Sequence, residues 1–237
     1  MARLKLIIGN RNYSTWSLRP WLALKHAGLP FDERLIRLDD ENFQQIVADV
    51  SPSRRVPVLV HGETTVWESM AILEYIHEIA PGAGLWPPDR ETRAMARSVS
   101  NEMHAGFSAI RNFMPMNLRR QDLKGKGRGP GVDKDITRIC EIWGDCRYRF
   151  GSGGDFLFGA FGAADAMFAP VVTRFDTYGV EVDGTCESYC RAVLAHPAFV
   201  EWREAALKEP WIVREDEVPA TGSGSLACSP DHAEGAR

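Results

Sequence analysis

The 237-residue sequence has no long apolar segment and no run of basic residues. No uninterrupted apolar stretch approaches the roughly 20 residues of a membrane-spanning helix, so we expect no membrane partner. The N-terminal stretch also lacks the cleavage pattern of a secretory signal peptide. The chain carries 28 basic and 32 acidic side chains, a formal net charge of −4, so we expect no nucleic-acid partner.

Cysteines are few, odd in number and absent from the first 139 residues. The five are Cys140, Cys146, Cys186, Cys190 and Cys228. Their spacings, C-x5-C and C-x3-C, differ from the C-x2-C of zinc ribbons and thiol–disulfide redox motifs. An odd number without framework spacing favours reduced thiols and a cytoplasmic location. The six histidines form no ligand cluster, so we expect no metal.

The first part of the chain, residues 1–81, alternates short apolar runs with helical patterns. We expect strands at residues 4–8, 33–38, 56–60 and 64–67, and helices at 17–26, 42–48 and 69–80. Ser17 is the expected N-cap of the first helix, with Pro20 in its first turn, and Ser69 is the expected N-cap of the third. Strand–helix–strand units of this length favour parallel pairing, to which the final hairpin adds an antiparallel edge.

The second part of the chain has a different pattern. Residues 82–89 are rich in turn-forming residues and are interpreted as a linker. Residues 90–215 show long helical patterns, with one long helix or a kinked pair at 90–119 and further helices at 136–150, 161–178 and 197–207. Residues 216–237 contain almost no large apolar residues and are predicted to form a disordered tail. The sequence therefore predicts a small α/β domain followed by an all-helical domain.

Several short motifs follow one another in an order that resembles a bacterial glutathione transferase. They are YSTWSLRPW at 13–21, RRVPVL at 54–59, ESMAILEYI at 68–76, FLFG at 156–159 and ADA at 164–166. The resemblance covers roughly residues 3–210. It implies a thioredoxin-like N-terminal domain, an all-helical C-terminal domain, glutathione as the co-substrate, and a homodimer.

The resemblance also implies how glutathione is held. Val56-Pro57 would ordinarily be trans, but the family holds this proline in cis, which turns the main chain of Val56 towards the cysteinyl part of glutathione. The helix start at Ser69 suits the γ-glutamyl carboxylate, although a plain N-cap also explains this serine. Glu68 is matched to the ammonium group. Arg55 or its neighbour Arg54 is matched to the glycyl carboxylate, with simple solvation as the alternative.

A transferase must also stabilise the glutathione thiolate, which a hydroxyl hydrogen bond and a helix N-terminus both favour. Residues 14–19, Ser-Thr-Trp-Ser-Leu-Arg, are similar to the Ser-Ser-Cys-Ser-Trp-Arg opening of zeta-class transferases. This similarity places the catalytic serine on Ser14 and puts Trp16 where that class has cysteine. Tyr13 is the second candidate, because other classes use tyrosine. Since the loop lacks cysteine, chemistry through a protein–glutathione mixed disulfide is not expected.

The second substrate is expected against the first long helix of the helical domain. The segment His104-Ala-Gly-Phe107 resembles the His-x-x-Phe of beta-class transferases, whose histidine faces the sulfur. Met103 and Phe107 are also explained as core residues, whereas Trp16 and Arg111 are expected to line the cleft. The predicted reaction is conjugation of glutathione to a small apolar electrophile, in a detoxification role. A maleylacetoacetate-like, glutathione-dependent isomerase and a non-catalytic ligand-binding protein of the same fold are the alternatives.

Overall fold

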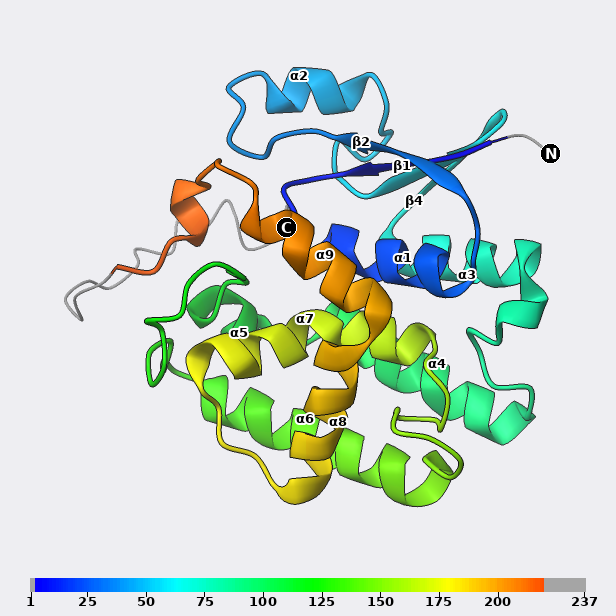
Figure 1. Ribbon diagram of the computed structural model, residues 1–237, viewed down its shortest axis with the longest axis vertical. Helices are drawn as coiled ribbons and strands as arrows, with labels where there is room; N and C mark the ends of the chain where they lie inside the picture. The colour runs from blue at the N-terminus through cyan, green and yellow to red at the C-terminus, as the bar shows by residue number, and fades with distance from the viewer. Residues whose placement is uncertain (1–2, 220–237) are drawn as a thin grey trace.

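The computed structural model describes residues 3–219, which fold as a small mixed sheet against a larger set of helices (Figure 1). The four-stranded sheet has the order β2-β1-β3-β4. Its strands are β1 (Leu4–Ile8), β2 (Phe31–Leu35), β3 (Val58–His61) and β4 (Thr64–Trp67). Strand β1 pairs in parallel with β2 and antiparallel with β3, which pairs antiparallel with β4. This topology confirms the parallel unit and the antiparallel edge expected from the sequence.

Both faces of the sheet are covered by helices. The helices of this half are α1 (Thr15–His26), α2 (Phe43–Ala48) and α3 (Ser69–Ile79). Strand β1 is buried on both sides, with Leu6 and Ile8 in the main core and Ile7 in a smaller cluster with Val47 of α2. Successive side chains of a strand point to opposite faces, which explains why the residues of this strand other than the exposed Lys5 are apolar. Helix α2 therefore lies across the sheet from α1 and α3 (Figure 1).

The start of α1 differs from the expectation. The helix begins at Thr15, so Ser14 occupies the N-cap position and Ser17 lies inside the first turn. The Oγ of Ser17 accepts a hydrogen bond from the backbone N–H of Gly9 at 3.0 Å. The predicted N-cap role of Ser17 is therefore wrong, because its hydroxyl serves the preceding loop. Pro20 likewise lies within the helix and not in its first turn.

The helical half contains one helix that the sequence patterns did not indicate. Its helices are α4 (Arg90–Ala105), α5 (Ser108–Phe113), α6 (Val132–Phe150), α7 (Ala163–Tyr178), α8 (Gly184–Ala195) and α9 (Pro197–Leu207). The kinked pair expected at 90–119 is present, with the break at Gly106 and at Phe107, whose φ is 61°. Helix α8 was missed although Cys186, Tyr189 and Val193 are buried at helical spacing. Asp183 caps the helix by accepting the N–H of Cys186 at 2.8 Å.

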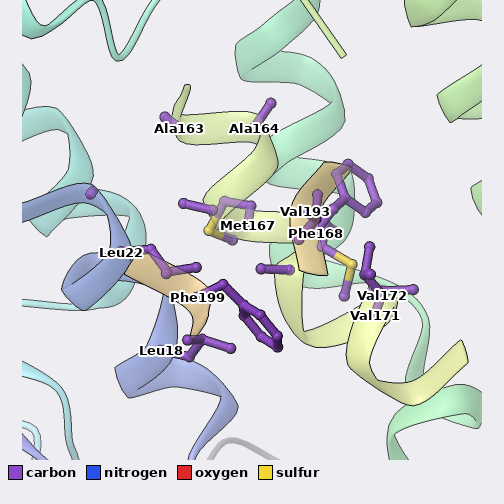
Figure 2. Close-up of a cluster of buried hydrophobic side chains, with 14 of the residues drawn as sticks. Leu18, Leu22, Ala163, Ala164, Met167, Phe168, Val171, Val172, Val193 and Phe199 are labelled. Atoms are coloured by element: carbon purple, nitrogen blue, oxygen red, sulfur yellow. The ribbon is translucent and has the colours of Figure 1, made fainter. Parts of the chain in front are cut away.

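One apolar core joins the two halves. Helix α7 is almost entirely buried and packs against α1 from one side and α4 from another. Figure 2 shows Leu18 and Leu22 of α1 in the same cluster as Met167 of α7 and Phe199 of α9. The start of α7 is held by Asp165, which accepts the backbone N–H groups of Leu157 at 3.1 Å and Gly162 at 2.8 Å. The α/β half and the helical half thus share a core across the predicted linker.

The predicted disordered tail begins too early. Asp216 is buried, and the Oε1 of Glu217 accepts hydrogen bonds from the hydroxyl of Tyr13 at 2.6 Å and from Nδ2 of Asn117 at 2.8 Å. This segment is held by polar contacts, so its lack of apolar residues was misleading. The remainder of the predicted tail, residues 220–237, lies outside the described residues. Within residues 3–219, no helix is both long enough and apolar enough to cross a bilayer.

Candidate functional site

A cleft of about 490 Å³ opens between the start of α1, the segment before β3, and helices α4 and α5. Its walls are formed by Trp16, Ser53, Arg55, Val56, Pro57, Glu68, His104, Ala105 and Arg111. Seven of these residues are candidates from the sequence, and they come from both halves of the chain. The cleft is more polar than a site for an apolar electrophile was expected to be, because it includes two arginines, a histidine and a carboxylate.

The floor of the cleft is a stretch of backbone beside the start of α3. The Val56-Pro57 peptide bond is cis, as the resemblance implied. Glu68 is the N-cap residue of α3 and has a φ of 69°, which places Ser69 at the first helical position. The predicted N-cap role of Ser69 is therefore wrong. The Oγ of Ser69 is buried and has no partner among the described residues, which leaves it and the free N–H groups of the first turn available to an anion.

The two hydroxyls proposed as thiol activators have different partners. Ser14 is 3% exposed, and its Oγ donates to the Oγ of Ser17 at 2.8 Å. The Tyr13 hydroxyl donates to Glu217 at 2.6 Å and accepts from Arg119 at 2.8 Å. Burial, with a further contribution from Glu217, raises the pKa of Tyr13. Neither residue is among the described residues that line the cleft. The Tyr13 proton is held by a carboxylate, whereas the Ser14 proton is donated to a neutral hydroxyl.

The helical wall of the cleft is built on α1 and α4. The imidazole of His104 lies edge-on to the indole of Trp16, with ring centroids 5.1 Å apart. Its Nε2 is 3.8 Å from Oε2 of Glu68, on the opposite side of the cleft. Burial, followed by the nearby positive charge of Arg19, lowers the pKa of His104, so the imidazole is neutral at neutral pH.

Met103 and Phe107 do not form part of this wall. Met103 is fully buried, and Phe107 is 8% exposed; both belong to the main core. Neither is among the described residues that line the cleft. The core interpretation of these two residues is therefore the correct one.

The comparisons with known proteins agree with this geometry. Residues 13–79 match the family model for the N-terminal domain of glutathione S-transferase, and residues 131–205 match the one for its C-terminal domain. Glutathione S-transferase 1 of Dianthus caryophyllus is 30% identical over 70% of this chain and 75% of its own length. This chain belongs to the glutathione S-transferase family. Maleylacetoacetate isomerase of Pseudomonas aeruginosa is 28% identical over 83% of this chain and 93% of its own.

A solved structure supports the same assignment. A glutathione transferase homolog from Burkholderia, determined with bound glutathione, has a TM-score of 0.66 and 25% identity to this transferase-family chain. The match covers 87% of this chain and 98% of the homolog. The α/β half with its cleft and the helical half are therefore arranged as in a glutathione transferase. Among residues 3–219, no group of three or more histidine, cysteine or acidic side chains is placed to hold a metal.

Two arginines lie against Trp16, an arrangement that the sequence patterns did not indicate. The guanidinium carbon of Arg19 is 4.1 Å from the Trp16 ring centroid, and that of Arg111 is 5.0 Å away. Both guanidinium groups donate to backbone carbonyls, Arg19 to Met167 at 3.0 Å and Arg111 to His104 at 3.0 Å. Within the described part of the chain, no ion pair is found for either arginine, although the charge of Asp135 partly opposes the lowering of the Arg111 pKa that burial causes. The Nε of Arg111 is buried without a partner.

This arrangement leaves positive charge at the helical wall of the cleft. Burial, together with repulsion from Arg111, lowers the pKa of Arg19. Burial and the same repulsion lower the pKa of Arg174 on α7 to about 10. Arg174 remains charged at neutral pH, since its lowered pKa of about 10 lies far above it. In sequence these residues resemble ordinary helix-surface arginines, and only their shared surroundings in the fold distinguish them.

Proposed function

We propose that this protein binds glutathione in the cleft and activates its thiol with the Ser14 hydroxyl at the N-terminus of α1. The observation that carries the proposal is the convergence of three features on one cleft. These are the cis Val56-Pro57 backbone, Glu68 at the start of α3, which is followed by Ser69 with its unpartnered Oγ, and Trp16 in the first turn of α1, which Ser14 precedes as the N-cap residue. The first two suit the peptide and carboxylate parts of glutathione, and the third suits its sulfur.

Each part of glutathione then has a partner of matching chemistry. The γ-glutamyl carboxylate lies at the start of α3 with Ser69, and its ammonium group lies beside Glu68. The cysteinyl main chain pairs with Val56 as a short added strand. Arg55 lies on the same wall of the cleft, where its charge suits the glycyl carboxylate.

The proposed reaction is nucleophilic attack by the bound thiolate. Ser14 Oγ–H donates to the sulfur, and the α1 dipole adds a favourable field, so the thiol loses its proton at lower pH than in water. The thiolate forms a carbon–sulfur bond with an electrophilic carbon, and the leaving group departs with the bonding electrons. Trp16 provides the flat wall against which an aromatic electrophile packs.

A second candidate function is a glutathione-dependent isomerase, and the arginines around Trp16 favour it. Arg111 lines the cleft with no carboxylate partner among the described residues, which suits a substrate that carries its own carboxylate. In this reaction the thiolate adds to one carbon of a cis double bond. Rotation about the resulting single bond and elimination of the thiolate return glutathione unchanged. The relatives named maleylacetoacetate isomerase are consistent with this chemistry.

Binding and thiol consumption test these functions. Titration calorimetry with glutathione should give saturable binding, and undetectable binding at millimolar glutathione would overturn the proposal. An aryl chloride with two nitro groups tests conjugation, which consumes thiol and releases chloride. A cis-dicarboxylate of the maleyl type tests isomerisation, which leaves the thiol concentration constant. Glutathione binding without turnover of either substrate class would instead indicate a binding protein.

The oligomeric state and the location of the protein remain predictions of the family resemblance. We expect a homodimer in which the α/β half of one subunit packs against the helical half of its partner, and a cytoplasmic location. The molecular mass measured by light scattering in solution tests the dimer directly.

A further inference from the structure

The loop that carries Ser14 is buried although it has no regular secondary structure. Asn10, Asn12 and Ser14 are each at most 3% exposed. Buried backbone N–H groups require partners, and some of these lie within the loop: the N–H groups of Tyr13 and Ser14 donate to the carbonyl of Asn10 at 3.2 and 2.8 Å. The N–H groups of Arg11 and Asn12, however, find their acceptor elsewhere in the chain.

That acceptor is a single carboxylate from the far end of the sequence. Glu209 follows α9, and its Oε1 accepts the N–H of Arg11 at 2.9 Å across a separation of 198 residues. Its Oε2 accepts the N–H of Asn12 at 3.3 Å. The Glu209 side chain is 5% exposed, and its charge is opposed by the guanidinium of Arg11 at 3.3 Å. Charge-assisted bonds of this kind are the stronger class of hydrogen bond.

The loop is also held by side-chain and backbone contacts of Asn12 with Asn117 and Arg119. Nδ2 of Asn12 donates to Oδ1 of Asn117 at 2.9 Å, and Oδ1 of Asn12 accepts the N–H of Arg119 at 3.0 Å. The Arg119 guanidinium in turn donates to the carbonyls of Glu209 and Trp211. Figure 1 shows the chain after α9 passing beside the end of β1, where this loop begins. The helical half therefore determines the position of the loop.

We propose that Glu209 is a positioning residue that acts on the glutathione thiol through Ser14. Glu209 binds the backbone N–H groups of Arg11 and Asn12, so it would act on the thiol only through the loop that carries Ser14 and is not itself a catalytic residue. It determines where the backbone from Arg11 to Ser14 runs, and thereby where the Ser14 hydroxyl and the first N–H groups of α1 point. The inference rests on the proposed function, because a positioned thiol activator matters only if glutathione is bound.

Glu209→Gln is the variant that tests this role. The amide keeps one acceptor oxygen but turns an NH₂ group towards the second N–H of the loop, which moves the loop without removing side-chain volume. Since Val56 and Ser69 are untouched, glutathione should still bind. The expected result is an alkaline shift of the pH profile for kcat by about one pKa unit, with KM for glutathione within about twofold and kcat at neutral pH about tenfold lower.

A matched control comes from α9, the helix that precedes Glu209. Glu201 on α9 forms an exposed ion pair with Lys25 of α1 at 2.7 Å, away from the loop. Glu201→Gln should leave the pH profile unchanged. The pKa of the bound thiol is read directly from thiolate ultraviolet absorbance against pH, and thermal unfolding confirms that each variant is folded.

The outcomes separate this inference from the proposed function. A wild-type protein that fails to bind glutathione overturns the proposed function, and the inference with it. A wild-type protein with a lowered thiol pKa that Glu209→Gln leaves unchanged overturns the positioning role alone. The role is also overturned if Glu209→Gln and Glu201→Gln shift the pH profile equally. Glu209→Asp, which restores the charge on a shorter side chain, should recover part of the shift.

Discussion

The hydroxyl of Ser14 donates a hydrogen bond to the Oγ of Ser17 at 2.8 Å, at the first turn of the helix that points at the cleft. The same Oγ of Ser17 also accepts a hydrogen bond from the backbone N–H of Gly9 at 3.0 Å. Ser17 therefore stabilises the loop, whereas the Ser14 proton can turn from Ser17 to a bound thiolate without leaving a backbone group unpaired. This difference separates a structural serine from one that is free to act on a ligand.

Ser14→Ala should raise the pKa of the bound glutathione thiol and lower kcat/KM at neutral pH by about a hundredfold, because one preorganised donor to the developing anion is lost. Tyr13→Phe should change the thiol pKa little, since the Tyr13 proton is held by Glu217. Thiolate absorbance and initial rates measure both effects. The reverse result, a large shift in Tyr13→Phe alone, would transfer the activating role to Tyr13.

Ser69→Ala should weaken glutathione binding by roughly tenfold without changing the thiol pKa, because a hydrogen bond to a carboxylate contributes roughly 1.5–3 kcal/mol. Calorimetry measures the affinity. Ser98→Ala on α4 is the control, since the Ser98 hydroxyl is exposed and donates to the carbonyl of Ala94. Equal affinities for the wild type and Ser69→Ala would show that the Ser69 hydroxyl does not bind the carboxylate at the start of α3.

Arg111→Gln should lower kcat/KM for a cis-dicarboxylate by roughly tenfold to a hundredfold, because a charge-assisted contact to the substrate is lost. The rate with an uncharged aryl chloride should change far less. Arg97→Gln serves as the control, since Arg97 also lies on the helical half but forms an exposed pair with Glu74 at 2.9 Å. If both substrate types are affected alike, Arg111 acts by holding the wall and not by recognising charge.

Stability should fall in mild acid because of two half-buried histidines. His196 stacks on Phe161 with ring centroids 4.2 Å apart and lies 5.9 Å from His26. Burial lowers the pKa of both histidines below the usual 6.5, and His26 lowers that of His196 further. Below about pH 6.5 the unfolded chain therefore binds more protons than the folded protein. The contribution of these histidines to the free energy of unfolding is present above pH 6.5 and is lost as the pH falls.

The variant His196→Asn isolates this effect. The free energy of unfolding should decrease between about pH 7 and about pH 5.5 in the wild type, and decrease less in the variant. Asp165, whose pKa burial raises to about 6, acts in the opposite direction but is common to both proteins. Urea unfolding at the two pH values provides the measurement. Identical decreases in the two proteins would show that His196 is not a source of the pH dependence.

Local patterns in the sequence determined the order of the elements and several of the residues that line the cleft. Apolar alternation and helical spacing are properties of neighbouring residues, so the strands at Leu4–Ile8 and Thr64–Trp67 and the helix that follows were correctly predicted. Val56-Pro57 and Glu68-Ser69 are likewise adjacent in the chain. Helix α8 was missed although Cys186, Tyr189 and Val193 follow helical spacing. The N-cap of α1 was misplaced because Ser14 and Ser17 both precede or begin the helical pattern, and that of α3 by one residue, from Glu68 to Ser69.

The partners of those residues were decided by the tertiary structure. The Tyr13 hydroxyl donates to Glu217, 204 residues away, and the loop before Ser14 is held by Glu209. Arg19 and Arg111 become a pair only because α1 and α5 bring them to Trp16. Hydrogen bonds and electrostatic interactions depend on distance in space. For residues far apart in the chain, the number of residues between them does not indicate that distance. The sequence therefore determined which groups are available, whereas the fold decided which of them are free to meet a ligand.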